Sequence, residues 1–480
     1  MMMLEYFFSI PIKEDGNPDE SEIFTKRDIF SKMNIKNDHS ILEDYCAKYP
    51  TLFLSFKDIK ATNFEDIKGK VTRLIQNLYL THIYLLQSSK LNTVDKTIFQ
   101  KYLDRSLDTG DLEASIKFLS MLMFKHFNQK VIVLIDEYDA PLNKGYAQKL
   151  LTQEKIEEEK DLYFQETLSL FRDILGEALK DNIFLKKSMI TGILRIAKES
   201  LFSGLNNLGE DSILDKNFAK YFGFTENDVD YLLQKSGMNH NPEIEKNMKS
   251  WYNGYSIGGF TIYNPWSIMN CLNHNGVFKS YWVGTANTAL IEQALILDQF
   301  QEEMQTLVEG GYVEMLADPK MVFSDIKSSS NALYNLLLFS GYLTAEKIKP
   351  TLDGMTYLCQ VKIPNQEIRG VFMSSVMKWV ERKFKTDSRE YRSFVTNLLS
   401  GDIPKFINAL KRYLEASASY IDSGKQAELL YNGFMWGLFA SSINEDYFVE
   451  KEREIGKGRA DLLIIPKETS PYSIAFIFGI

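Results

Sequence analysis

Cysteine and histidine are scarce in this sequence, whose 480 residues include three cysteines and five histidines. Cys46, Cys271 and Cys359 lie too far apart along the chain to form a pair or a metal-binding spacing. The histidines are isolated from one another, so a zinc-type cluster is not expected. Unpaired cysteines of this kind are typical of a protein in a reducing compartment.

Long apolar runs are also absent, since none approaches the roughly 20 residues that a membrane-spanning helix needs. The first residues, MMMLEYFFSIPIKEDG, lack a basic leader, and Glu5 interrupts their apolar run, so they do not fit a signal peptide. We therefore expect a cytoplasmic protein with no membrane partner. The net charge of −9 argues against a surface built wholly for nucleic acid, although it allows a local basic groove.

The N-terminal half shows strands that alternate with helices. A chain of 480 residues is too long for one core, so two or three domains are expected. The predicted strands are 51–56, 131–135 and 184–192, and the predicted helices are 1–10, 64–86, 112–127 and 158–180. This alternation predicts a parallel sheet with helices on both faces.

The pattern changes beyond about residue 222, where helical segments with aromatic-rich turns predict a mostly helical middle domain. From about residue 390 the chain holds further helices, followed by two strand-like segments, GRADLLIIP (458–466) and SIAFIFGI (473–480). These segments predict a small α/β domain at the end of the chain.

The stretch VIVLIDEYDAPLNKGY (131–146) carries the clearest chemical signal, because five apolar residues lead directly into Asp136 and Glu137. At the end of a buried strand, one carboxylate can hold Mg²⁺ through its water shell, and the next can orient and deprotonate an attacking water. The alternative is that the two acidic residues only end a strand and begin a turn. The unbroken apolar run before them favours the functional interpretation.

Five segments in one order resemble a bacterial AAA-ATPase-like family, in which the ATPase is usually fused to a C-terminal nuclease domain of the PD-(D/E)XK superfamily. They are VIVLIDEYDAPLNKGY, MITGILRIAKESLFSGLNNL (189–208), WYNGYSIGGFTIYNPWSIMNCL (251–272), YWVGTANTALI (281–291) and LLLFSGYLTAE (336–346). The resemblance implies an α/β protein with four parts. These are an AAA-ATPase-like domain at 1–222, a helical lid-like or winged-helix-like domain at 223–345, a junction at 346–389 and an incomplete nuclease-like domain at 390–480.

The resemblance also implies roles for single residues. Asp136 and Glu137 correspond to the Walker B motif, with Asp136 on Mg²⁺ and ATP as the nucleotide. Thr191 is placed where it could sense the γ-phosphate, and Arg195 is a candidate charge stabiliser. For Arg195, a surface arginine that opens a helix is an equally good interpretation.

The phosphate loop that should accompany Walker B is missing. Such a loop needs G-x-x-x-x-G-K-[S/T], so that backbone N–H groups, a lysine and a hydroxyl surround the phosphates. Gly-Lys occurs at 69–70, 424–425 and 456–457, never followed by Ser or Thr. The family carries its loop just before a helix that resembles MMMLEYFF. We therefore expect a P-loop-type sheet without its first strand, in a chain that is truncated.

The resemblance to the nuclease superfamily places Asp461 as the first acidic residue of a metal site and Glu428 as the helical acid. The next strand should carry E-x-K, whose carboxylate binds Mg²⁺ and whose lysine positions the hydrolytic water. Phe478 and Ile480 stand at those two positions. Apolar side chains do not bind a divalent cation, so we expect a nuclease-like domain without activity.

Three functions stay open from the sequence: an inactive ATPase–nuclease copy, an interaction module that works without nucleotide, or a working ATPase whose ends are wrongly assigned. DNA is an expected partner and oligomer formation is compatible with the family, both by resemblance only. The aromatic turns 251–255 and 263–266 could stack on bases, although packed corners are the more common role of such turns.

Overall fold

In the computed structural model, the chain forms two compact units, the first made mainly of Met1–Glu210 and the second mainly of Asp211–Asp318 and Ser328–Ile480. The residues that the structure describes are 1–61, 63–104, 107–142, 157–180, 182–192, 208–238, 241–282, 291, 303–304, 306–308, 310–319, 330–352, 354–384, 388–418, 447–455 and 458–478. Among these residues, no helix has both the length and the apolar character needed to cross a membrane.

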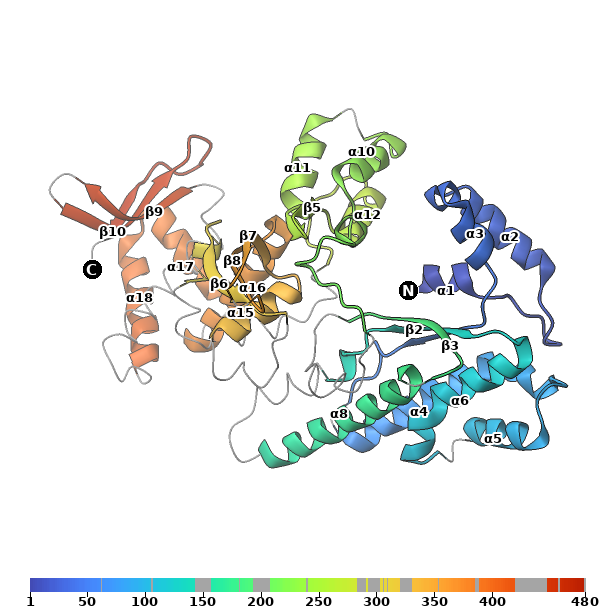
Figure 1. Ribbon diagram of the computed structural model, residues 1–480. Helices are drawn as coiled ribbons and strands as arrows, with labels where there is room; N and C mark the ends of the chain where they lie inside the picture. Colours follow the sequence, from blue (N-terminus) through green and yellow to red (C-terminus); the bar gives the residue numbers. More distant parts are fainter. Residues whose placement is uncertain are drawn as a thin grey trace. The chain divides into compact units, whose positions relative to one another are not determined.

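The first unit begins with three short helices that pack around Phe7, Phe30 and Cys46 (Figure 1). They are α1 (Met2–Phe8), α2 (Glu20–Ser31) and α3 (His39–Tyr45), with the 3₁₀ turn η1 (Asn34–Asn37) between the last two. Helix α1 has no side-chain cap. Asp19 caps α2 by accepting hydrogen bonds from two backbone N–H groups of its first turn.

A three-stranded parallel sheet lies at the centre of this unit, as predicted. Its strands are β1 (Thr51–Ser55), β2 (Val131–Asp136) and β3 (Leu185–Ile190), in the order β1-β2-β3. The first five residues of β2 are buried, which explains their unbroken apolar run. Asp136 is the last residue of this middle strand, at the position that the sequence predicted.

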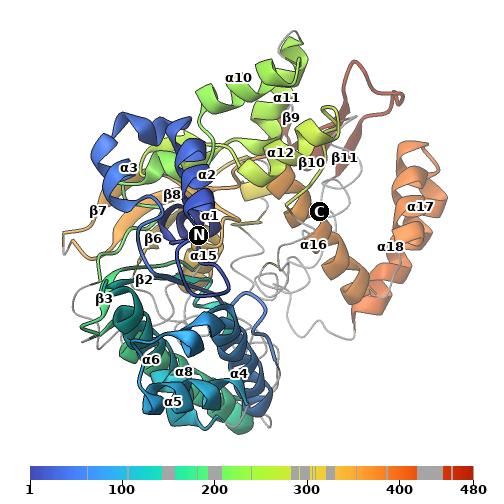
Figure 2. The same ribbon diagram turned by 90° about the vertical axis from the view of Figure 1, so that its right-hand side faces the viewer.

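The long helices of the first unit lie together on one side of the sheet (Figures 1 and 2). They are α4 (Phe64–Thr81), α5 (Thr93–Leu103), α6 (Thr109–Phe127) and α8 (Glu157–Leu179), with the 3₁₀ turn η2 (Ile83–Gln87) after α4. Helix α6 begins at a capping box of Asp108 and Asp111 and ends at Asn128, whose φ of 54° is left-handed. Its buried stripe and that of α8 pack against each other, so these helices form one layer.

Strand β3 differs from its neighbours because the four residues Lys186–Met189 are all exposed. A parallel strand is usually covered on both faces. The expectation of helices on both faces of the sheet is therefore not met at β3 in the described part of the chain. Within that part, β3 pairs with β2 alone and forms an edge of the sheet.

The second unit begins with helices around a small hairpin. They are η4 (Ala219–Tyr221), α10 (Glu226–Lys235), α11 (Pro242–Tyr252), the hairpin β4 (Tyr255–Ile257) and β5 (Phe260–Ile262), and α12 (Pro265–Asn273). The aromatic turns serve as packed corners at Tyr252 and Tyr263, which are 0% and 3% exposed. Trp266, by contrast, is 54% exposed.

An antiparallel sheet follows, which the sequence did not predict, although the described elements within 223–345 contain more helix than strand. Strands β6 (Val313–Ala317), β7 (Thr344–Pro350) and β8 (Tyr357–Lys362) are arranged in the order β6-β8-β7. In the sequence, α15 (Ser330–Phe339) lies between β6 and β7, and α16 (Gln366–Phe384) follows β8. β6 buries every second residue, which is the period of a strand with one covered face. The segment is short, so its alternation was not recognised as a strand.

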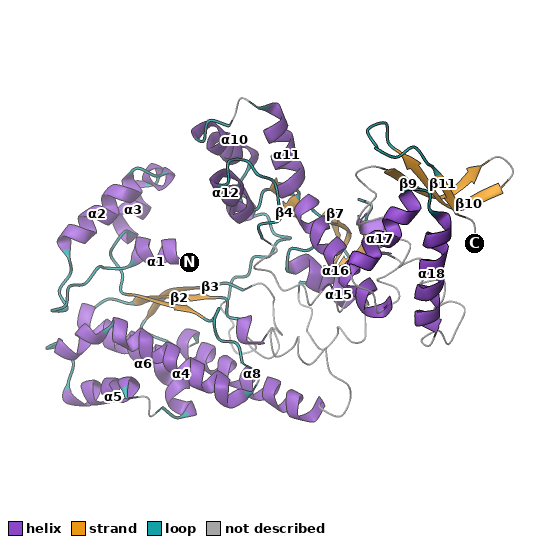
Figure 3. Ribbon diagram, turned by 180° about the vertical axis from the view of Figure 1, so that it is seen from behind, coloured by secondary structure: helices purple, strands orange, loops and turns teal. Residues whose placement is uncertain are grey.

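The last part of the chain contains α17 (Ser388–Leu399), α18 (Ile403–Ala418) and three antiparallel strands (Figure 3). The strands are β9 (Tyr447–Ile455), β10 (Gly458–Pro466) and β11 (Phe476–Phe478), in the order β11-β10-β9. β10 and β11 were predicted, whereas β9 was not. Tyr447, Ile464 and Phe476 join the core of the second unit.

Candidate active site at the ends of the parallel strands

The carboxyl ends of the three parallel strands bring together Asp136, Glu137 and Thr191, three of the residues predicted to carry chemistry. Asp136 stands in register with Ser55 at the end of β1. Its backbone carbonyl accepts a hydrogen bond of 3.0 Å from Phe56. On the other side, the backbone N–H of Thr191 donates to the carbonyl of Ile135 at 2.9 Å. Ligand sites of open parallel sheets lie at this end of the strands.

Thr191 is joined to Asp136 by its side chain as well. Its hydroxyl donates a hydrogen bond to Oδ1 of Asp136 at 2.6 Å. Its carbonyl accepts a hydrogen bond of 3.1 Å from the backbone of Tyr138, which binds the segment after β2 to the end of β3. Both side chains keep partial exposure, so the pair is open to solvent.

Glu137 follows Asp136 in a left-handed backbone conformation, with φ of 51°. Non-glycine residues seldom adopt this conformation, and they do so more often at functional sites than elsewhere. Burial raises the pKa of Glu137, and the charge of Asp136 acts in the same direction, while Lys57 opposes them. A carboxyl group whose pKa is raised toward neutrality is better suited to accept a proton from water.

We call the residues around Asp136 and Thr191, at the carboxyl ends of β2 and β3, the Asp136–Thr191 corner. Gly192 and Asp139 belong to this corner, although the sequence did not single them out. A Cβ atom at Gly192 would lie 2.5 Å from a ring carbon of Tyr138 and 2.7 Å from Oδ1 of Asp139. Asp139 is 1% exposed. A larger residue at 192 would therefore displace the segment after β2. The signal available in the sequence was a second aspartate, three positions after Asp136.

The donor set at this corner fits a weakly held Mg²⁺. The described residues contain no group of three or more His, Cys, Asp or Glu side chains close enough to hold a metal ion. Mg²⁺ usually keeps several waters and takes one or two carboxylates together with substrate phosphates. Asp136 would supply such a carboxylate, with Thr191 fixing one of its oxygens.

The remaining predicted site residues are not brought to this corner by the described structure. Arg195, Glu428 and Ile480 lie outside the described residues. Asp461 is in β10, but its side chain is also outside that set. The backbone of Phe478 pairs with Leu462, so the final strand lies beside the one that carries Asp461.

Two curated proteins are similar to the chain. An uncharacterized protein in the vnfD 5′ region of Azotobacter chroococcum mcd 1 is 22% identical over 362 residues, covering 75% of this chain and 61% of that protein. The transcription elongation factor GreA of Borreliella burgdorferi is 27% identical over 197 residues, covering 38% of this chain and 20% of that protein.

The chain thus spans less than two thirds of the length of either relative. No solved structure matches it. Residues 1–202, which contain all three parallel strands and the Asp136–Thr191 corner, match the AAA-ATPase-like family, described as a predicted AAA-ATPase.

Proposed function

We propose that residues 1–202 are a nucleotide-binding domain of the AAA-ATPase type that carries the metal and water half of an ATP site. The observation behind the proposal is the 2.6 Å hydrogen bond from Thr191 to Asp136 at the ends of adjacent parallel strands. Glu137, the next residue, has a raised pKa. The match of residues 1–202 to a predicted AAA-ATPase family supports the same assignment.

The roles follow from the positions of the side chains. Asp136 would hold Mg²⁺ through its water shell, and Thr191 keeps the carboxylate of Asp136 in one orientation. Glu137 accepts a proton from the attacking water, which its raised pKa favours. We assign Arg195 to charge stabilisation by family resemblance alone. Mg²⁺ and ATP supply the charge neutralisation and the transferred phosphoryl group when they are bound.

The phosphate-binding half of such a site has no counterpart among the 480 residues, none of which form G-x-x-x-x-G-K-[S/T]. Without a lysine and backbone N–H groups around the phosphates, a carboxylate pair attracts Mg²⁺ only weakly and repels ATP. Hydrolysis therefore requires phosphate-binding groups from another segment or another chain. We propose that these 480 residues alone neither bind ATP saturably at millimolar concentration nor hydrolyse it.

The metal half is tested by titration with Mn²⁺, followed by electron paramagnetic resonance. We expect weak binding that Asp136→Asn abolishes. Asp28→Asn, which removes an exposed carboxylate that pairs with Lys32, should leave that binding unchanged. Equal Mn²⁺ binding by wild type and Asp136→Asn would overturn the assignment.

The phosphate half is tested with ATP and Mg²⁺ in a phosphate-release assay. Wild type and Glu137→Gln should both release phosphate no faster than buffer that contains ATP and Mg²⁺ without protein. Robust hydrolysis by wild type that Glu137→Gln abolishes would show that the chain contains a phosphate site that its sequence does not reveal.

For the end of the chain we propose a nuclease-like fold without catalysis, with DNA as the related substrate class. The arrangement that supports it is β10, which carries Asp461, paired with β11, where Phe478 stands in place of an acidic residue. We expect no Mg²⁺- or Mn²⁺-dependent cleavage of DNA. Joint Phe478→Glu and Ile480→Lys changes are necessary for any cleavage. Cleavage by wild type that Asp461→Ala abolishes would contradict this proposal.

A further inference from the structure

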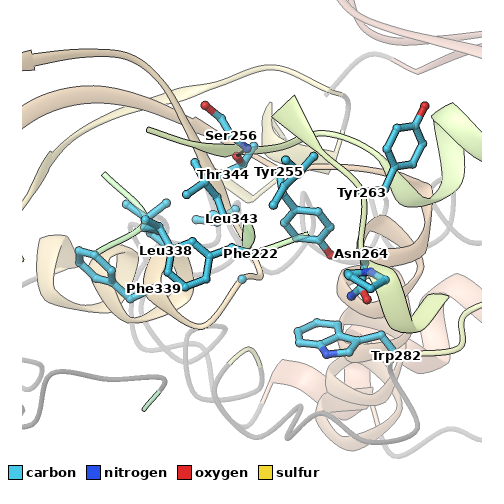
Figure 4. Close-up of a pocket in the computed structure, with 15 residues that line it drawn as sticks. Phe222, Tyr255, Ser256, Tyr263, Asn264, Trp282, Leu338, Phe339, Leu343 and Thr344 are labelled. Atoms are coloured by element: carbon cyan, nitrogen blue, oxygen red, sulfur yellow. Dashed lines mark hydrogen bonds between the residues drawn. The ribbon is translucent and has the colours of Figure 1, made fainter. Parts of the chain in front are cut away.

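The second unit contains an apolar cavity of about 280 Å³, which Figure 4 shows with Tyr255, Trp282 and Thr344 among its lining residues. None of the described residues that line it carries a charge. Such a cavity does not suit a phosphate group, which is best bound by positive charge and hydrogen-bond donors. Positive charge is found instead in the first unit, beside the Asp136–Thr191 corner.

The loop that follows β1 is anchored by buried side chains. Phe56 is fully buried, and its ring packs edge to face at 5.0 Å from that of Phe171 in α8. The carbonyl of Phe56 accepts a hydrogen bond of 2.9 Å from the backbone N–H of Ile59, which is also buried. The carbonyl of Ala61 accepts another, of 3.2 Å, from the hydroxyl of Tyr163 in α8. The backbone of this loop is therefore held against α8.

Lys57 and Lys60 are exposed side chains of this anchored loop. The loop begins next to the corner, because the backbone N–H just after β1 donates a hydrogen bond of 3.0 Å to the carbonyl of Asp136. The charges of both lysines act on the carboxylate of Glu137 and lower its pKa, against the larger effect of burial. The two positive charges therefore lie near the carboxylates of the corner.

Charges of opposite sign are close to one another here without forming ion pairs. Within the part of the chain that the structure describes, the ammonium groups of Lys57 and Lys60 form no ion pair and donate no hydrogen bond. The carboxylate of Glu137 is likewise without an ion pair, although both cations act on it. A ligand that carries charges of both signs complements such a site. Mg²⁺ bound to phosphates is such a ligand, with its metal on the carboxylates and its phosphates on the lysines.

We propose that Lys57 and Lys60 contact the phosphates of a metal-bound nucleotide from the β1 side of the Asp136–Thr191 corner. Asp136 is on the middle strand, and Thr191 lies beyond it on the β3 side. The two lysines do not replace a glycine-rich loop, because they add no backbone N–H groups, so they hold phosphates weakly by themselves. This inference rests on the proposed function, which assigns a metal-bound nucleotide to the corner.

The test measures how fast single lysines of the full chain react with a limiting amount of acetic anhydride, resolved by mass spectrometry. The probe is tripolyphosphate, which carries the phosphates of a nucleotide without its base, and sodium chloride of equal ionic strength is the reference. Tripolyphosphate should slow acetylation of Lys57 and Lys60 about threefold, because a nearby anion favours the unreactive ammonium form. Lys186 and Lys187, adjacent exposed lysines of β3, are the internal control and should react as in the salt reference.

Variants that remove or keep the charge separate a binding role of Lys57 from a structural one. In Lys57→Gln, the protection of Lys60 by tripolyphosphate should fall, because one of two cations is lost. In Lys57→Arg, which keeps the charge, the protection should stay near that of wild type. Lys36→Gln, at an exposed position elsewhere in the first unit, is the matched control and should leave the protection unchanged.

Metal binding supplies a second measurement with the opposite sign. In the absence of phosphate, Lys57→Gln should tighten Mn²⁺ binding about twofold, because a positive charge near the metal is removed. A lysine that only stabilises the loop would not change the binding of metal and of phosphate in opposite directions. Tighter Mn²⁺ binding with unchanged protection of Lys60 would therefore overturn the inference.

The outcomes also distinguish this inference from the metal assignment. Mg²⁺ should increase the protection by tripolyphosphate in wild type but not in Asp136→Asn. If Asp136→Asn leaves Mn²⁺ binding unchanged while tripolyphosphate still protects Lys57 and Lys60 selectively, the metal assignment fails and the phosphate contacts of the lysines stand. Equal slowing of acetylation at Lys57, Lys60, Lys186 and Lys187 would overturn the inference.

Discussion

The hydroxyl of Thr191 donates a hydrogen bond of 2.6 Å to the carboxylate of Asp136, joining two residues that are 55 positions apart in the chain. The two side chains meet because β2 and β3 are parallel neighbours whose carboxyl ends coincide. The contact therefore depends on the register of β2 and β3, and it fixes the relative positions of two residues of the candidate site.

Replacing Thr191 by valine should destabilise the first unit by about 1 kcal/mol, because the shape is kept while a hydrogen bond to a charged group is lost. Thr191→Ser keeps the hydroxyl and serves as the control. Urea unfolding of both variants measures the difference. If valine and serine variants unfold at the same urea concentration, the hydrogen bond does not contribute to stability.

Glu137→Gln should stabilise the chain at pH 8. The pKa of Glu137 is raised above its ordinary value of 4.5, so its ionised form is disfavoured in the folded state. The resulting loss of folding free energy is absent below pH 4.5 and complete once the pH exceeds the raised pKa. The difference in stability between Glu137→Gln and wild type should therefore shrink as the pH falls from 8 to 4.5. Thermal unfolding of both proteins at several pH values measures this difference.

Glu14→Gln, at an exposed turn, provides the comparison and should show a small difference that varies little with pH. An advantage of Glu137→Gln that grows as the pH falls would show that the sign of the pKa shift is wrong.

Stability should fall as the pH drops from about 6.5 to about 4, in part because of His82. Burial lowers the pKa of this histidine from its ordinary 6.5 to about 4. Between these values the unfolded state binds a proton that the folded state does not, so acid favours unfolding. His82→Gln should flatten this part of the stability profile, and His39→Gln, on the exposed start of α3, should not. Equal slopes for wild type and His82→Gln would contradict the prediction.

Gly254 and Gly259 form a matched pair in the second unit. Both have left-handed φ values, of 99° and 85°. A Cβ atom at Gly254 would lie 2.1 Å from the carbonyl oxygen of Pro364, whereas one at Gly259 would meet nothing within 4 Å. Gly259→Ala should cost about 1 kcal/mol from backbone strain. Gly254→Ala should cost about 1–3 kcal/mol more, because backbone must move.

Unfolding of the two alanine variants by urea measures this contrast. Similar costs would mean that the turn before Tyr255 can relax.

The sequence alone determined the parallel sheet and the place of Asp136 in it. Five apolar residues in a row have no polar face, so the segment 131–135 must be buried on both sides, and a carboxylate that follows must lie at its end. Helix α6 was predicted from residue 112, whereas the capping box of Asp108 and Asp111 starts it at Thr109. Short strands with one covered face, such as β6, were missed, because a few alternating residues fit several structures.

Only the tertiary structure decided which side chains meet. The Thr191–Asp136 hydrogen bond depends on strand order, and the raised pKa of Glu137 depends on how much of it is buried. The cavity lined by Tyr255 and Thr344 joins residues 255–265 to residues 338–344, which are far apart along the chain. The burial of the Tyr255 ring and the hydrogen-bond partners of its hydroxyl have no signature in the sequence, because both are properties of packing and not of local residue order.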